Sequence, residues 1–373
     1  MRRTGLAELP LHPGHAPRWL FDRMVRLADG IVGVILYEYG QEEFLRRISD
    51  PFWFQALSCV LGFDWHSSGT TTVTCGVLKC AIDPQRQGLA ITGGKGRVSR
   101  MVPKELRDLA GVFPLSTERI EGLEHASKMA AKVDNAAVQD AHQLYHHAFL
   151  VTEEGKWAVV QQGMNPEAKT ARRYHWLSDH VHSFVEEPHE CILGTKQKRT
   201  LDLTARESGE CRAISVDLAK ERPEKVGNAL KAIRPAYQRS LEEWLPELGD
   251  TGSYAVKTLY MPRRINWDAL RRTYEFQPSN YEELIGIGGV GPATVRALAL
   301  ISELAYGKPP SWRDPVKYSF AVGGKDGVPY PVDREAMDES AEMLKRGVEE
   351  AQVGKTERLK ALQRLRRVIP DGI

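Results

Sequence analysis

The run from Leu284 to Leu300 constrains the fold of this chain more than any other stretch of the sequence. Four glycines lie between positions 286 and 291, and Pro292 follows them directly. Glycine allows a tight turn, whereas proline is tolerated in the first turn of a helix because its missing N–H would have no partner there. The run therefore predicts a short helix, a turn pinned by Ile287 and Val290, and a second helix that begins at Pro292.

The start of that second helix is suited to binding an anion. Unpaired backbone N–H groups and the positive end of a helix favour negative charge, and glycine lets a phosphate approach closely. A helical turn without a ligand would show the same pattern, so this alternative stays open. Residues 281–302 resemble the helix-hairpin-helix motif of DNA-repair and DNA-processing proteins, which holds a DNA phosphate with such N–H groups. The resemblance implies that nucleic acid is bound at Gly286, Gly289, Gly291, Thr294 and Arg296.

The composition is that of a soluble globular protein with two domains. The chain has 373 residues, 42% of them hydrophobic, and its net charge is only +2. Such a weak charge argues against a non-specific wrapper of nucleic acid but suits a phosphate site built from backbone amides. Five cysteines without a C-x-x-C pair indicate a reducing, cytoplasmic location. The most apolar early stretch, residues 31–36, is too short to span a membrane, and we expect no secretory signal.

Strand signals fade near residue 215, which predicts a boundary between two domains. Residues 1–215 are expected to form an α+β domain of mixed helices with a small sheet or β-hairpin. This domain is expected to carry the catalytic site. Residues 216–373 are expected to form an all-α domain that contains the hairpin at 281–302. In the first domain, helices are expected at 17–48, 52–61, 103–110 and 124–147, and 73–82 is a helix or a strand, with a helix favoured. Strands are expected at 88–92, 148–152, 156–162 and 200–204, and an irregular segment or short helix at 166–178.

All 11 histidines lie between His12 and His189, which places acid–base or metal chemistry in the N-terminal part. Residues 127–147, wound as one helix, would put their polar side chains in one stripe, Lys132 and His146 among them. Asp140 would fall in the apolar arc, where a carboxylate needs a partner or a ligand. Two interpretations remain: an amphipathic surface helix with one hydrogen-bonded aspartate, or a helix that presents its polar stripe to a phosphate or a base.

Two further segments carry candidate residues. Asp64 and His66 follow a predicted helix in a loop rich in Ser, Thr and Gly, where they could bind a metal or orient a water. The hydroxyls of that loop could equally cap the next helix. Arg172 and Arg173 open the run Arg172-Arg-Tyr-His-Trp176, which suits phosphate contacts and stacking on nucleobases, but equally an aromatic core.

These residues together favour a DNA-processing enzyme, associated with repair, that hydrolyses phosphodiester bonds with a metal. The candidate catalytic residues are Asp64, His66, Lys132, Asp134, Asp140 and His146, with Lys132 as the charge stabiliser. Carboxylate ligands favour Mg²⁺ or Mn²⁺ and a histidine-rich set favours Zn²⁺, so the metal stays open. No nucleotide cofactor is expected, because Gly93-Gly-Lys-Gly96 does not match the Gly-x4-Gly-Lys-Ser/Thr phosphate loop.

Most of the chain also resembles an uncharacterised family, a domain of unknown function that is frequent in thermophilic archaea and bacteria. The resemblance extends over roughly residues 5–365 and implies kinship without an activity. The matching runs include Gly62-Phe-Asp-Trp-His-Ser-Ser-Gly69, Trp157-Ala-Val-Val-Gln-Gln-Gly-Met164, Arg172-Arg-Tyr-His-Trp176 and Gly323-Gly-Lys-Asp-Gly327.

The hairpin is similar, in addition, to that of helix-hairpin-helix DNA glycosylases, which carry a catalytic aspartate a short distance beyond it. Asp314 lies near that distance, so a glycosylase that uses Asp314 is the first alternative function. Bifunctional members carry a lysine where this chain has Ala293-Thr294, which argues against lyase activity. The second alternative is a non-catalytic nucleic-acid-binding protein. RNA as the target and the oligomeric state both stay open.

Overall fold

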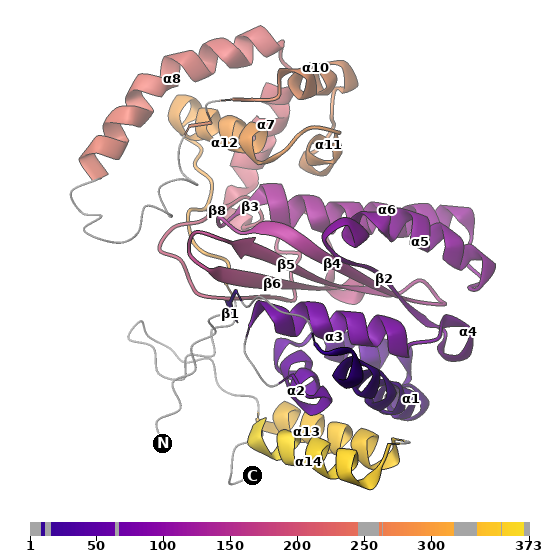
Figure 1. The fold of residues 1–373 in the computed structure, drawn as a ribbon. Coiled ribbons are helices and arrows are strands. Elements are labelled where there is room, and N and C mark those ends of the chain that lie inside the picture. Colours follow the sequence, from indigo (N-terminus) through magenta and orange to yellow (C-terminus); the bar gives the residue numbers. More distant parts are fainter. Residues whose placement is uncertain are drawn as a thin grey trace.

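The computed structural model describes residues 9–11, 16–63, 67–244, 261–262, 264–316, 334–351 and 353–368. These residues form a mixed α/β fold: a central antiparallel sheet carries helices on both faces, and further helices are stacked outside them (Figure 1). Among the described residues, no helix has both the length and the apolar character needed to cross a bilayer.

The main sheet contains six strands in the order β1-β6-β5-β4-β2, with β7 paired to β6. Its long strands β4 (Gln143–Thr152) and β5 (Trp157–Asn165) form the hairpin that their β-branched and aromatic residues predict. Strand β6 (Thr170–Leu177) pairs with β5. The shorter strands of this sheet are β1 (Leu9–Pro10), β2 (Leu89–Lys95) and β7 (Cys191–Leu193), and a separate pair consists of β3 (Val138–Gln139) and β8 (Leu201–Asp202).

One face of the sheet is covered by α1 (Arg18–Ser49), α2 (Pro51–Leu61) and α3 (Ser68–Ala81), with the short α4 (Pro84–Gln87) beside them (Figure 1). Helix α2 begins as its sequence predicts. The Asp50 carboxylate accepts the N–H of Phe52 at 2.7 Å, and Pro51 occupies the first helical position. Helix α1 is interrupted at Gly40, whose φ of 84° lies in the left-handed region that favours glycine.

The last two helices, α13 (Arg334–Glu350) and α14 (Lys355–Val368), pack on α1 and α2 (Figure 1). Leu344 and Val348 are fully buried in the same apolar cluster as Ile31 and Trp53. The contact is close, because a Cβ added at Gly30 would lie 2.5 Å from the Cβ of Ala351. Helices α13 and α14 thus lie against the N-terminal helices and not beside the glycine-rich hairpin.

The other face of the sheet is covered by α5 (Val102–Asp108) and α6 (Thr117–Lys132), on which the remaining helices are stacked (Figure 1). One continuous apolar cluster runs from the sheet through α6 into these outer helices. The outer helices are α7 (Gly209–Ala219), α8 (Pro223–Trp244), α10 (Trp267–Phe276), α11 (Tyr281–Gly286) and α12 (Pro292–Tyr306). Short 3₁₀ segments occupy Gly96–Met101, Leu109–Gly111, Ser178–His180 and Arg206–Ser208.

Two sequence-based expectations about this region are wrong. The predicted helix over 124–147 ends at Lys132, continues as one π-helical turn over Val133–Ala137, and gives way to β3 and β4. The polar stripe along that helix therefore does not exist. Residues 166–178, expected to be irregular or helical, contain β6. Both segments are drawn into the sheet by pairing with distant strands, which local periodicity does not reveal.

Candidate functional site

The glycine-rich turn joins two helices that are close in the sequence, and both lie where the sequence predicts them. Helix α11 ends at Gly286 and α12 begins at Pro292, with Gly288 and Gly289 exposed between them. Gly289 has a φ of 88°, and a Cβ there would lie 2.5 Å from a guanidinium nitrogen of Arg272. The turn therefore requires glycine at this position.

Helix α12 differs from its neighbours in having no side-chain cap. The Asn280 amide oxygen accepts the N–H of Glu283 at the start of α11, and Asn266 caps α10 in the same way. The N-cap of α12 is Gly291, which has no side chain to accept an N–H, and the first turn of α12 has no acidic residue. The N–H groups that open a helix have no intrahelical partner, so those of α12 remain free to bind an anion.

Three polar side chains hold the inner side of this hairpin to the body of the protein. Lys132 Nζ donates to the carbonyls of Val290 at 2.7 Å and Ile287 at 3.3 Å. Gln139 Nε2 donates to the carbonyl of Pro292 at 2.9 Å, while its Oε1 accepts from Arg296 at 3.1 Å. Burial, together with the charge of Lys128, lowers the pKa of Lys132.

These contacts change the roles expected for several hairpin residues. Lys132 positions the hairpin turn and is not directed at a carboxylate. Arg296 also faces inward, since it donates to Gln139. The Thr294 side chain is buried, so only its backbone could meet a ligand.

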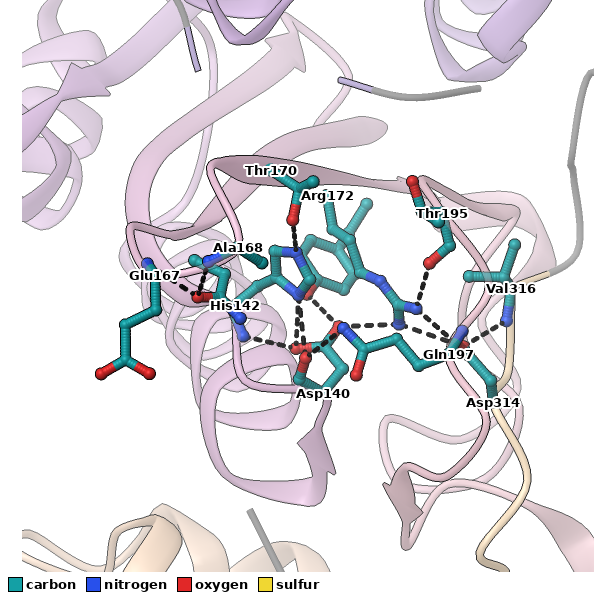
Figure 2. Close-up of polar contacts among 12 residues, drawn as sticks. Asp140, His142, Glu167, Ala168, Thr170, Arg172, Thr195, Gln197, Asp314 and Val316 are labelled. Carbon is teal, nitrogen blue, oxygen red and sulfur yellow. Dashed lines mark hydrogen bonds and ion pairs between the residues drawn. The ribbon is translucent and has the colours of Figure 1, made fainter. Parts of the chain in front are cut away.

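Arg172 lies at the centre of a buried ion-pair cluster (Figure 2). It donates to Asp140 Oδ2 at 3.0 Å, to Asp314 Oδ1 at 3.0 Å and to the carbonyl of Thr195 at 2.8 Å. Asp314 also accepts the backbone N–H groups of Gln197 and Val316. The Arg172 and Asp314 side chains have no exposed surface, so neither is presented to a nucleic acid or a base.

Asp140 is held by one donor close to it in the sequence and by two donors from β6. The N–H of His142 and the hydroxyl of Tyr174 donate to its carboxylate at 2.9 and 2.6 Å, in addition to Arg172. Burial by itself raises the pKa of this carboxyl, but the charge of Arg172 and the contacts of His142 outweigh it and hold the pKa of Asp140 well below its usual range.

Asp134 belongs to a second buried network on the same face of the sheet. Its carboxylate accepts from Gln161 Nε2 at 2.5 Å and Trp176 Nε1 at 3.1 Å, and it pairs with His189. Burial raises the pKa of Asp134. Gln161 Oε1 in turn lies 2.8 Å from His147 Nδ1, whose pKa burial lowers to about 4.

His146 and Arg173 lie on the opposite face of the sheet, against α3. Successive strand residues alternate between faces, so His147 and Arg172 point to α6 while His146 and Arg173 point away from it. Arg172 and Arg173 therefore do not form one surface patch. Burial lowers the pKa of His146 to about 3.

The six candidate catalytic residues are thus not gathered by the described part of the chain. Lys132, Asp134 and Asp140 lie on the α6 side and His146 on the α3 side, while Asp64 and His66, like Gly323–Gly327, lie outside the described residues. Within the described ranges, no three His, Cys, Asp or Glu side chains are placed to hold a metal ion. The carboxylates of Asp134 and Asp140 accept N–H and O–H donors and do not fit a metal in this arrangement.

Some partners in these networks were not singled out from the sequence. His189, Thr195 and Gln197 come from the irregular segment before β8, where no periodicity signals a contact. For Tyr174 the sequence suggests stacking on a base or a place in an aromatic core, and not a hydrogen bond to Asp140. The one usable signal was Asp140 in an apolar context, which indicated a paired carboxylate.

One family model, described as a protein of unknown function, matches residues 5–332 of the chain. No curated protein matches, and no solved structure does.

Proposed function

We propose that this chain, which belongs to the family DUF763, binds DNA by its sugar–phosphate backbone at the α11–α12 hairpin. The observation that carries the proposal is the start of α12: an exposed glycine turn leads into a helix of 15 residues with neither a capping side chain nor an acid in its first turn. Such a terminus binds phosphate through N–H groups and the positive helix end.

The surroundings of the turn favour an anion. Arg272 of α10 is exposed beside it, and Asn266 Nδ2 donates to the carbonyl of Gly289 at 3.3 Å, which fixes the turn. Lys128 is exposed one turn before Lys132, which itself holds the hairpin. Because only a few cations are involved, we expect weak, sequence-independent binding whose dependence on salt is shallow.

Metal-dependent hydrolysis of DNA remains a proposal that rests only on the sequence pattern around Asp64 and His66. The glycosylase alternative is less favoured, because Asp314 is enclosed by Arg172 and two backbone N–H groups. Labelled duplexes incubated with Mg²⁺, Mn²⁺ or Zn²⁺ separate the two activities. Breaks that EDTA abolishes support the nuclease, and breaks that appear only after alkali and survive EDTA support the glycosylase.

The variant Gly291→Asp tests the binding site directly. Gly291 has an extended backbone (φ −133°, ψ −174°) and nothing within 4 Å of an added Cβ, so a side chain fits there without strain. Aspartate at an N-cap accepts the free N–H groups and adds negative charge, so the fold should be kept or stabilised while DNA binding is lost.

The matched control is Gly291→Asn, which caps the same N–H groups without the charge. Fluorescence anisotropy with a labelled duplex at low ionic strength should give the affinity order wild type, Gly291→Asn, Gly291→Asp, with unfolding curves as the check on folding. Equal affinity of wild type and Gly291→Asp would reject the hairpin as the DNA site. A single-stranded RNA competitor in the same assay shows which nucleic acid is preferred.

A further inference from the structure

A pocket of about 480 Å³ lies between α8 and α10, within the group of outer helices that carries the hairpin. One wall is the first part of α8, and the other is formed by Met261, Pro262 and Ile265 together with the start of α10. The two helices contact each other at the top of Figure 1. The volume is in the range of pockets that bind small organic molecules.

Trp267, the first residue of α10, is an exposed aromatic wall of this pocket. Its side chain is 44% exposed, and no aromatic ring of the described residues is stacked on it. Gly227 of α8 allows the indole to lie close, because a Cβ there would be 3.1 Å from its Cη2 atom. Contact with a flat apolar ligand would remove the exposed part of this ring from water, which is favourable.

Polar groups of several kinds surround the indole. Glu224, Asn228 and Lys231 lie four and three residues apart on α8, so they share one side of that helix. All three are exposed. Arg271 lines the pocket one turn further along α10, where its guanidinium donates to Asp268 at 3.2 Å. The pocket therefore offers acceptors and donors to the edge of a ring, and cations to a phosphate.

The pocket is continuous with the hairpin through the start of α10. Asn266, which precedes Trp267, donates to the carbonyl of Gly289 in the turn at 3.3 Å. Arg272, which follows Arg271, reaches the same place, since a Cβ at Gly289 would lie 2.5 Å from its guanidinium. Adjacent Cα atoms are about 3.8 Å apart, which is close to the rise of about 3.4 Å per nucleotide in a stacked strand. A strand whose phosphate lies at the turn can therefore bring a neighbouring base to the pocket.

We propose that this pocket takes one unpaired nucleobase of a DNA strand that is bound at the hairpin. Trp267 stacks on the face of the base, while Glu224 and Asn228 meet its polar edge. Lys231 and Arg271 neutralise the phosphates beside it. The inference rests on the DNA contact proposed above and adds a preference for single-stranded DNA, because a base that is paired inside a duplex cannot enter a pocket. Every base can stack on an aromatic ring, so we expect tolerance of any sequence.

Two affinities measured on the full chain test the pocket. Fluorescence anisotropy at low ionic strength gives the Kd for a labelled single strand and for the same strand in a blunt duplex. Trp267→Ala should weaken binding of the single strand roughly tenfold, as expected for the loss of one stacked base, and leave binding of the duplex unchanged. Trp267→Phe, which keeps a ring, should retain most of the single-strand affinity.

The matched control is Phe276→Ala. Phe276 is 59% exposed at the other end of α10 and does not line the pocket, so its removal should change neither affinity. Unfolding curves check the fold of each variant. The difference in emission between wild type and Trp267→Phe isolates the fluorescence of Trp267, which the single strand should quench and the duplex should not.

Gly291→Asp should weaken binding of single strand and duplex alike, so that the pocket and the hairpin can fail separately. Selective loss of single-strand binding in Trp267→Ala, with Gly291→Asp equal to wild type, keeps the pocket and rejects the hairpin. The pocket is overturned if Trp267→Ala weakens neither form or both forms equally, or if bound single strand leaves the emission of Trp267 unchanged. Wild type that binds neither form overturns both proposals.

Discussion

The buried ion pair of Asp140 and Arg172 connects three segments that are far apart in the sequence. The carboxylate of Asp140, from the segment before β4, meets a guanidinium from β6 that also binds Asp314 near the end of the outer helical group (Figure 2). Each partner is enclosed, so removing one leaves the others with an unmatched charge. Breaking such a pair is strongly destabilising even where its net contribution is small.

We expect Asp140→Asn to lower the free energy of unfolding by about 3 kcal/mol at neutral pH, because Arg172 loses a charged acceptor. Since the folded pKa of Asp140 lies below its unfolded value, its contribution is complete above the unfolded pKa of about 3.9 and is lost as the pH falls further. In urea unfolding, the free energies of unfolding of wild type and Asp140→Asn should therefore approach each other as the pH falls below about 3.9. A difference between these free energies that stays constant down to the lowest pH at which the protein is folded would contradict this account.

Lys132 was expected to stabilise charge during catalysis, but its ammonium group is directed at two carbonyls of the hairpin turn. Lys132→Met should cost about 1–3 kcal/mol of stability, because these carbonyls lose a charged donor, and should weaken DNA binding only moderately. Lys132→Arg, which keeps the charged donor, should keep most of the stability and most of the DNA binding. Normal stability of Lys132→Met combined with loss of a measured hydrolysis would instead favour the catalytic role.

The helices with strong local signals were predicted well from the sequence. Helix α2 has an Asp-Pro start and α12 has the glycine turn followed by proline, and both begin within a residue of the expected positions. The strand β4 was missed over its first half, because His146 and its neighbours carry no alternating pattern and enter the sheet only through β2 and β5. The opposite faces of His146 and His147 follow from that pairing, so a helical stripe could not have revealed them.

Helix α1 offers a test of the packing between the two ends of the chain. Gly30→Ala should destabilise the protein by roughly 1–3 kcal/mol, because the new methyl group would lie 2.5 Å from the Cβ of Ala351. Gly33→Ala, on the same helix with nothing within 4 Å of an added Cβ, should stabilise it by roughly 0.5–1 kcal/mol. Thermal unfolding gives both values. Two changes of the same sign would mean that α13 does not approach α1 in this way.

On the scale of the whole molecule, the sheet separates two different environments. On the α6 side, aspartates and arginine are matched and the hairpin is docked by Lys132 and Gln139. On the α3 side, Arg173 and His146 lack acceptors among the described residues. The sequence could not predict this division, because Arg172 and Arg173 are adjacent and chemically identical until strand pairing assigns each to a face. The packing of α13 and α14 on α1 likewise depends on contacts between residues far apart in the sequence.

Hydrogen–deuterium exchange with and without duplex DNA tests the central claim most directly. The N–H groups that open α12 have no intrahelical partners and should exchange quickly in the free protein. We predict that DNA slows exchange in peptides covering residues 286–295 of wild type and leaves these peptides unchanged in Gly291→Asp. Two outcomes, measured where DNA is bound, would contradict the assignment of the hairpin as the DNA-binding site. In the first, DNA slows exchange in other peptides but not in those covering residues 286–295. In the second, DNA changes the exchange of no peptide.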